Sequence, residues 1–525
     1  MSRWFRFTVF IFLLTLNFIQ LHSAVKEGDT LKFWSVTYVD WIKGQLPVQR
    51  HITAVCKKVG VRCYFFYDIE DTNKVSQSNI DFFVNKFDSS YYKLTDLYGS
   101  CPDALDNDPR VFLLAIKPDW WGGYFDPAQQ MPDTMVNRLW GVHSSEHEII
   151  YFSANLAKPD RVSVLAHEFG HMLGWGQDHS PEPPDNPTYY WEDVWIDEGY
   201  STFADSYLNG NINETGVFNN PFFEKDTRTS LIYFSYNFNY SSSMLFMTYM
   251  YEHYGKDTYI KSLLKNQLNG IASIRSTLLQ LGYNIPFDDI FENWTIANYA
   301  DDKDFQKGIY YYNHYDFPKR FIRNEHSAYP DSYTDSLRAY SSDYIELNSN
   351  DSLYNLKIVF NCERSSKFRL ALLLMKSIDS TIIDVIDVTL NSDNEGEYEL
   401  LNFGKDFDKV VMVVMNTDSS LKEFQYVDYS YHLTPSVAVV KESKKSKSGF
   451  SVNFNKSTES VYIKYPAYSY EKKQIFLYNL YGQLVSTLNT NNTEAGISVS
   501  GISRGLYFIC TKFGSKCLTK PVLVY

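Results

Sequence analysis

The segment Ala166–Leu173 (AHEFGHML) brings three residues capable of metal chemistry within five positions. His167 and His171 are four residues apart, so both project from the same face of a helix. Two imidazoles at this spacing can bind one Zn²⁺, and Glu168 then lies beside the water that the metal holds. The chain has only 11 histidines, which makes a chance match rare. The segment therefore predicts a zinc site with Glu168 as general base.

A catalytic zinc site needs a third protein ligand and one open position. His179 is one candidate, but the metzincin spacing HExxHxxGxxH would require histidine where this chain has Gln177. Glu198 is the second candidate, because a carboxylate commonly completes a site with two histidines. The neighbouring Asp197 is the third candidate. Both acidic residues lie in 191–208, a stretch with helical spacing of apolar residues.

The sequence around Glu198 resembles a known family of zinc peptidases. Trp195-Ile196-Asp197-Glu198-Gly199 is similar to the second helix of gluzincins, in which a W-x-N-E-G-like stretch presents a glutamate to zinc. The resemblance implies Glu198 as the third ligand, with Asp197 standing where the family often has asparagine. Twenty-six residues separate His171 from Glu198, more than in the thermolysin and aminopeptidase patterns, and a proline-rich loop accounts for the excess.

The resemblance to hyicolysin-like gluzincins covers roughly residues 30–310. It includes Tyr240–Gly255 and Phe287–Tyr299 after the glutamate, and Asp106–Ile116 and Gly122–Phe125 before the histidines. It implies an α+β zincin catalytic domain, with a mixed sheet, an active-site helix and a helical subdomain. The Gly-x-Met-Glu-Asn sequence of the aminopeptidase branch is absent from the chain, which favours endopeptidase over exopeptidase action on protein or peptide substrates.

Two further roles follow from the same resemblance. Several gluzincins use a tyrosine or histidine to stabilise the oxyanion, and Tyr240 is the candidate because it precedes the helix expected from Ser243. Zincins bind substrate along an edge strand that precedes the motif helix, and Glu148–Phe152 is the run expected there.

Three alternating acidic residues, Asp103, Asp106 and Asp108, suit Ca²⁺ as a second metal. They lack the remainder of an EF-hand loop, so a turn is the favoured interpretation and a calcium site is the alternative.

Residues 1–24 have the features of a secretory signal peptide. Arg3 and Arg6 precede the apolar stretch Phe7–Leu21, and a small residue, Ala24, follows near the expected cleavage site. No later segment is apolar over the roughly 20 residues that a spanning helix needs. We therefore expect a mature chain without a transmembrane anchor.

Residues 450–525 resemble a type A sorting domain of the type IX secretion system. The resemblance rests on Ile475–Val485 (IFLYNLYGQLV), Ser503–Ile509 (SRGLYFI) and the final Lys520–Tyr525 (KPVLVY). It implies that the type IX secretion machinery is a partner and that the protein is secreted or held at the cell surface. An unrelated β-sandwich that binds carbohydrate or matrix is the alternative.

The hydrophobic pattern divides the rest of the chain. Residues 25–180 mix helices with strand-like runs, residues 181–315 have mainly helical spacing, and period-two runs dominate 320–440. We expect a multidomain protein whose parts are a signal peptide (1–24), a catalytic domain (25–315), an accessory β-sandwich (320–440), a linker (441–449) and a small β-sandwich sorting domain (450–525).

Composition excludes two classes of protein. Charged residues make up 21% and aromatic residues 17%, which is typical of a folded rather than a disordered chain. The net charge of −13 argues against general nucleic-acid binding. One alternative of another class remains: a zincin-like domain without activity that serves as a surface adhesin or binding protein.

Six cysteines in an exported chain permit disulfides. The spacings of Cys56 to Cys63 and of Cys510 to Cys517 each suit a bridge that closes a turn or hairpin. Free, buried cysteines are the alternative.

Overall fold

The computed structural model describes most of the chain and separates it into two compact units, residues 1–437 and 438–525. Each unit is considered by itself. The described residues are 25–36, 48–71, 75–103, 105–106, 108–116, 122–178, 192–209, 228–235, 239–305, 308–313, 320–350, 355–436, 450–465, 473–479, 483–513 and 516–524. The predicted signal peptide, the linker 441–449 and His179 lie outside them.

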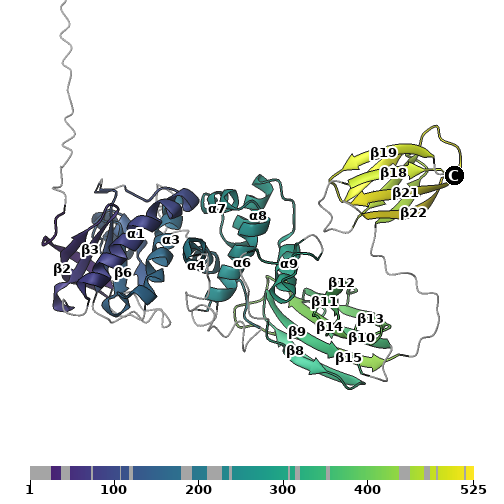
Figure 1. Ribbon diagram of the computed structural model, residues 1–525, viewed down its shortest axis with the longest axis horizontal. Helices are drawn as coiled ribbons and strands as arrows, with labels where there is room; N and C mark the ends of the chain where they lie inside the picture. The colour runs from purple at the N-terminus through teal and green to yellow at the C-terminus, as the bar shows by residue number, and fades with distance from the viewer. Residues whose placement is uncertain are drawn as a thin grey trace, which may run out of the picture. The chain divides into compact units, whose positions relative to one another are not determined.

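A mixed six-stranded sheet begins the first unit (Figure 1). The strand order is β1-β2-β3-β4-β6-β5; β3, β4 and β6 run parallel, and the other neighbours pair antiparallel. The bounds are β1 (Thr30–Val36), β2 (Gln49–Val59), β3 (Cys63–Asp68), β4 (Val111–Ile116), β5 (Gly123–Phe125) and β6 (Ile149–Ser153).

Helices α1 (Gln77–Tyr98) and α3 (Ser163–Asp178) pack on one face of this sheet. Aromatic side chains join the layers: between ring centroids, Phe83 of α1 lies 5.5 Å from Phe152 of β6, and within the helical layer Phe87 of α1 lies 5.0 Å from Phe169 of α3. The opposite face of the sheet carries a separate apolar cluster. The central strands β3, β4 and β6 are therefore buried on both faces and support α3, the helix with the histidine motif. A short helix, α2 (Asp133–Trp140), lies between β5 and β6 in the chain.

The edge of this sheet differs from the sequence prediction. The run Glu148–Phe152 was expected to be the edge strand, but β6 lies between β4 and β5, and all five of its residues are buried. The edge strand next to β6 is β5, which has only three residues and pairs antiparallel with β6. A strand this short gives almost no period-two signal, which explains the wrong assignment.

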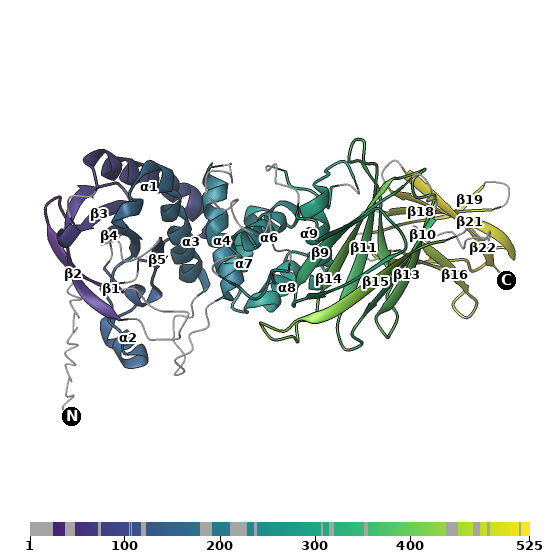
Figure 2. The ribbon, with the colours of Figure 1, turned by 90° about the horizontal axis from the view of Figure 1, so that it is seen from below.

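Helices dominate the next part of the unit, as the hydrophobic spacing predicts. Their bounds are α4 (Val194–Asn209), α6 (Tyr240–His253), α7 (Asp257–Leu264), α8 (Gly270–Gln280) and α9 (Phe287–Ala300). Helix α4 packs between α3 and α6 (Figure 2).

Glycines allow α3 and α4 to approach closely. A Cβ atom built at Gly170 would lie 2.9 Å from the Cα atom of Ser201, and one at Gly174 would lie 2.2 Å from the hydroxyl oxygen of Tyr200. The two glycines are four residues apart, so they share the face of α3 that meets α4. This close approach brings Glu198 of α4 to the motif histidines.

We expect Gly174→Ala to destabilise the protein by about 1–3 kcal/mol. At an exposed helical site the same change would stabilise by about 1 kcal/mol, but here the new methyl group meets the buried ring of Tyr200. Thermal unfolding measures the difference. Gly122→Ala is the matched control, because a Cβ at Gly122 meets no atom within 4 Å. A Gly174→Ala protein as stable as the control would contradict the close packing.

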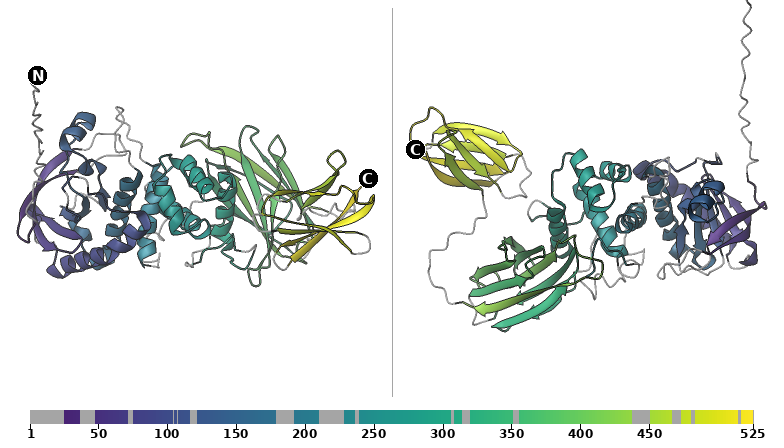
Figure 3. Two further views of the ribbon diagram at one scale, coloured as in Figure 1. Left: turned by 90° about the horizontal axis from the view of Figure 1, so that it is seen from above. Right: turned by 180° about the vertical axis from the view of Figure 1, so that it is seen from behind.

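Two β-sheets follow the helices and pack face to face (Figures 1 and 3). One has the order β13-β10-β15-β8 and the other β12-β11-β14-β9-β7. Their bounds are β7 (Asn324–His326), β8 (Asp331–Leu337), β9 (Ser341–Asn348), β10 (Asn355–Cys362), β11 (Phe368–Met375), β12 (Ile382–Val388), β13 (Glu395–Leu401), β14 (Lys409–Asn416) and β15 (Val427–Pro435).

The helical part and these sheets share one hydrophobic cluster. Arg369 of β11 also forms ion pairs with Asp289 and Glu292 of α9, at 2.8 and 2.6 Å. Together these contacts explain why residues up to 437 form a single compact unit. The predicted boundary between residues 315 and 320 stays a prediction.

The second unit has its own core and two small sheets, with the orders β16-β17-β20 and β19-β18-β21-β22. The strands are β16 (Ser451–Asn455), β17 (Ser460–Lys464), β18 (Lys473–Tyr478), β19 (Leu484–Thr490), β20 (Glu494–Ser498), β21 (Gly505–Phe513) and β22 (Lys516–Val524). Among the described residues of the whole chain, no helix is both long and apolar enough to cross a membrane.

The predicted bridge between Cys56 and Cys63 is wrong, since both thiols are free and buried. Cys56 lies on β2 in the cluster on one face of the first sheet, whereas Cys63 lies on β3 in the cluster on the opposite face. Side chains that point to opposite faces cannot be joined. Cys510 of β21 is disulfide-bonded.

Candidate metal centre

Three side chains from α3 and α4 converge on one point. The Nε2 atoms of His167 and His171 are 3.1 Å apart, and the Oε2 atom of Glu198 lies 3.3 Å and 3.4 Å from them. His171 and Glu198 are 8% and 7% exposed, and His167 is partly buried. The structure therefore brings together the ligand set that the gluzincin resemblance implies.

Side chains of α4 also contact the Nδ1 atom of each histidine, the ring nitrogen that does not face the point of convergence. The Nδ1 atom of His171 lies 2.9 Å from Oδ1 of Asp197, and that carboxylate accepts a hydrogen bond from the Tyr200 hydroxyl at 2.5 Å. The Nδ1 atom of His167 lies 3.4 Å from the Thr202 hydroxyl. A hydrogen bond from Nδ1 fixes the tautomer whose Nε2 lone pair faces the point of convergence.

These contacts place two of the three candidate third ligands, Glu198 and Asp197. Asp197 lies against the outer nitrogen of His171 and not with the three converging atoms, so it is an orienting residue in this arrangement. Sequence reasoning missed this role, and it also missed Tyr200 and Thr202. Thr202 could have been found from helical spacing, because it is four residues after Glu198 and lies on the same face of the helix. His179 lies outside the described residues.

The donor atoms fit a zinc ion. In a tetrahedral site with metal–ligand distances of about 2.0–2.1 Å, the ligand atoms are about 3.3 Å from one another. The three separations found here are 3.1, 3.3 and 3.4 Å. Glu198 Oε2 is also buried without a hydrogen-bond partner among the described residues.

The pKa values of Glu198 and His171 are shifted because these side chains lie so close together. Burial raises the pKa of Glu198, but the two histidines outweigh it and hold the pKa at about 2. Burial alone would lower the pKa of His171, yet Asp197 and Glu198 keep it well above its usual value. The centre is therefore an electrostatically coupled set in which a carboxylate stays ionised and attracts positive charge.

Glu168 occupies a different environment beside the ligands. It is 5% exposed, and its carboxylate accepts a hydrogen bond from the backbone N–H of Phe125 in β5. Burial raises its pKa, against the opposing influence of His167 and His171. The edge strand is close, because a Cβ built at Gly123 would lie 3.0 Å from Cγ of Glu168. A raised pKa is suited to a group that accepts and returns a proton.

Tyr240 begins α6 next to the histidines. Its ring centroid lies 6.0 Å from that of His167, and the side chain is partly exposed. The structure therefore places the candidate oxyanion donor near the ligand set, and its role stays a prediction.

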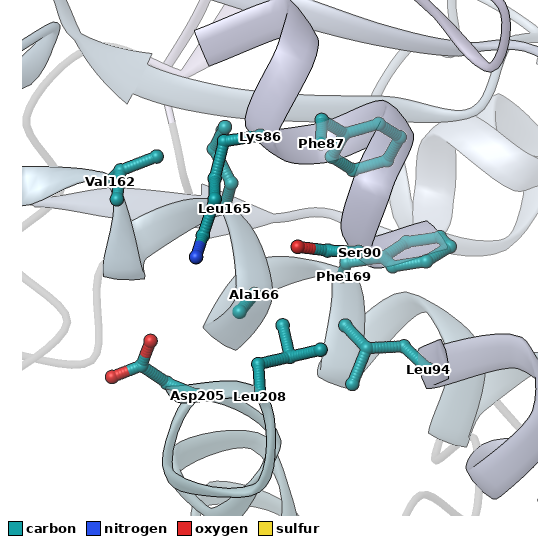
Figure 4. Close-up of a pocket in the computed structure, with 10 residues that line it drawn as sticks. All are labelled: Lys86, Phe87, Ser90, Leu94, Val162, Leu165, Ala166, Phe169, Asp205 and Leu208. Atoms are coloured by element: carbon teal, nitrogen blue, oxygen red, sulfur yellow. The ribbon is translucent and has the colours of Figure 1, made fainter. Parts of the chain in front are cut away.

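A small cavity between α1, α3 and α4 lies close by but has no part in the centre (Figure 4). Its walls are mainly apolar, and its charged side chains are Lys86 and Asp205. None of His167, His171 and Glu198 lines this cavity.

Comparison with known proteins identifies the second unit. Residues 455–525 match the family described as the secretion system C-terminal sorting domain. The chain ends in a type IX sorting domain. The sorting domain means that the protein is exported by this system to the cell surface or beyond it, as the sequence predicts. The rest of the chain is outside this match, and no curated protein matches the chain in sequence.

Solved structures add no functional information. A β-glucuronidase of Faecalibacterium prausnitzii shares 8% identity over 37% of this chain, with a TM-score of 0.15, and the chain spans only 36% of that protein. The Yersinia pseudotuberculosis-derived mitogen shares 13% identity over 21% of this chain and 90% of its own length, with a TM-score of 0.15. The BSP domain of a biofilm associated protein shares 10% identity over 37% of this chain and 51% of its own length, with a TM-score of 0.13. Similarity this low carries no argument about the metal centre.

Proposed function

We propose that this protein is a secreted zinc-dependent endopeptidase of the gluzincin type, with a zincin catalytic domain. One observation carries the proposal: His167, His171 and Glu198 converge at zinc-ligand spacing, with Glu168 beside them. A bound zinc ion would polarise the scissile carbonyl and lower the pKa of a water molecule towards about 7.

The chain's own residues account for the remaining steps. Glu168 accepts the proton of the attacking water and passes it to the leaving amine. The N–H of Phe125 holds the Glu168 carboxylate in place. Tyr240 donates a hydrogen bond to the oxygen on which negative charge develops. β5 is the last strand at its end of the sheet, and an extended peptide would bind along it beside Glu168.

The test uses the purified exported chain. We expect about one zinc ion per chain, cleavage of casein and of peptides blocked at the N-terminus, loss of cleavage after chelation, and recovery when zinc is returned. Bound zinc without any cleavage would instead support the inactive binding protein. Cleavage that requires a free N-terminus would replace the endopeptidase by an exopeptidase.

A further inference from the structure

A second group of acidic side chains lies where β4 and β6 begin. Asp103 and Asp106 precede β4, and Glu148 directly precedes β6. The two strands are parallel neighbours, and the N–H of Phe112 donates to the backbone oxygen of Glu148 at 2.7 Å. This pairing brings one carboxylate oxygen from each of the three acidic residues within 4.8 Å of the others.

Glu148 is the unusual member of this acidic cluster. Its residue is 2% exposed, and its Oε2 atom has no hydrogen-bond partner within the described part of the chain. A carboxylate in such a position is costly unless a positive charge or a donor faces it. Burial, followed by the charges of Asp106 and Asp103, raises the pKa of Glu148 to about 8.

The nearby basic side chains already have partners. His147 contacts Asp106 through Nδ1 at 2.7 Å, and Arg110 pairs with Asp108 at 3.1 Å. Neither Asp103 nor Glu148 forms an ion pair with any described residue. Among the described residues, therefore, no basic side chain neutralises Glu148, the most deeply buried carboxyl group of the acidic cluster.

Asp108 is not a member of the cluster, although the sequence groups it with Asp103 and Asp106. One of its oxygens accepts the hydroxyl of Tyr64 at 2.5 Å, and the other bonds to Arg110. Glu148, which is 40 or more residues away in the chain, takes its place.

We propose that Asp103, Asp106 and Glu148 bind a Ca²⁺ ion. All three offer oxygen, the only ligand type that Ca²⁺ uses in proteins, and backbone carbonyls and water can complete its 6–8 ligands. Ca²⁺ tolerates irregular geometry, whereas Mg²⁺ requires a near-octahedral site. An exported protein also meets extracellular Ca²⁺, for which dissociation constants of about 10⁻⁴–10⁻³ M are adequate.

The proposed ion would stabilise the platform of the metal centre. It would connect the segment before β4 to the start of β6. It would also neutralise the buried carboxylate of Glu148. The segment after α1 is also tied to α3, since the Gln177 side chain donates to the backbone oxygen of Ser100 at 3.1 Å. Calcium binding is therefore expected to raise thermal stability, whether or not the protein cleaves peptides.

The test is calcium titration of the full exported chain, by calorimetry and by thermal unfolding, with MgCl₂ in parallel. Glu148→Gln and Asp103→Asn are the test variants, and Asp160→Asn is the control because the Asp160 side chain is 73% exposed. We expect about one Ca²⁺ per chain and a calcium-dependent rise in the unfolding temperature. Both test variants should bind at least about tenfold more weakly, and the control should be unchanged.

The calcium-free proteins supply an independent readout. Glu148→Gln should unfold at the same temperature as the native chain or higher, because the neutral amide avoids the cost of ionising a buried carboxyl group. Asp103 is exposed, so Asp103→Asn tests the site even if Glu148→Gln fails to fold. The proposal is overturned if the native chain binds no calcium, if all variants bind it equally, or if Mg²⁺ binds as well.

Discussion

Substitution of Glu168 by glutamine is expected to lower kcat/KM for peptide cleavage by about 10²–10⁴-fold, with zinc still bound. Glutamine has almost the same volume and can still accept the hydrogen bond from Phe125, so the contact with β5 is retained. It cannot take a proton from water or return one to an amine. The loss should therefore appear in kcat, because substrate binding along the strand edge does not require the charge.

Steady-state kinetics on a blocked peptide, together with zinc analysis of the same preparation, make this measurement. Glu70→Gln serves as the control, since Glu70 is exposed and is not part of the centre. Full activity in Glu168→Gln would remove Glu168 as the general base. Loss of zinc together with activity would show that the variant damaged the centre and not the proton transfer alone.

Sequence predicts best those residues of the metal centre that are close together in the chain. His167, Glu168 and His171 lie on one turn of one helix, and their relative positions follow from helical geometry alone. The preference for Glu198 over the other candidate ligands comes from a family resemblance, because its approach to the histidines depends on how α3 packs against α4. Gly170 and Gly174 make that approach possible, but nothing in the sequence says which neighbouring helix they face.

Non-local pairing limits prediction of the fold in the same way. The buried strand β4, Val111–Ile116, is the kind of strand that sequence can define, since it consists of six apolar residues between polar flanks. The strands β1 and β2 were not predicted. The order of strands, which makes β6 internal and β5 the edge, depends on contacts between distant segments. The same pairing of β4 with β6 brings Glu148 to Asp103, a combination that spacing in the chain conceals.

The second large effect concerns the third ligand. Glu198→Ala is expected to lower zinc affinity by more than about 100-fold and to abolish cleavage, because only two histidines would remain. Asp197→Asn should weaken zinc by about 10–100-fold, the range for residues that orient a ligand. The reason is geometric: Glu198 Oε2 faces both Nε2 atoms, whereas Asp197 contacts Nδ1 of His171.

Zinc titration of Glu198→Ala, Asp197→Asn and His179→Ala, each checked for folding by thermal unfolding, separates the three candidate ligands. We expect His179→Ala to bind zinc like the native chain. A metzincin-like centre would give the opposite result: loss of zinc in His179→Ala, with retained zinc and activity in Glu198→Ala. If Asp197 were the ligand, Asp197→Asn would lose more affinity than Glu198→Ala. Because each ligand set predicts a different order of affinities, the ranking decides among them even if every variant is weakened.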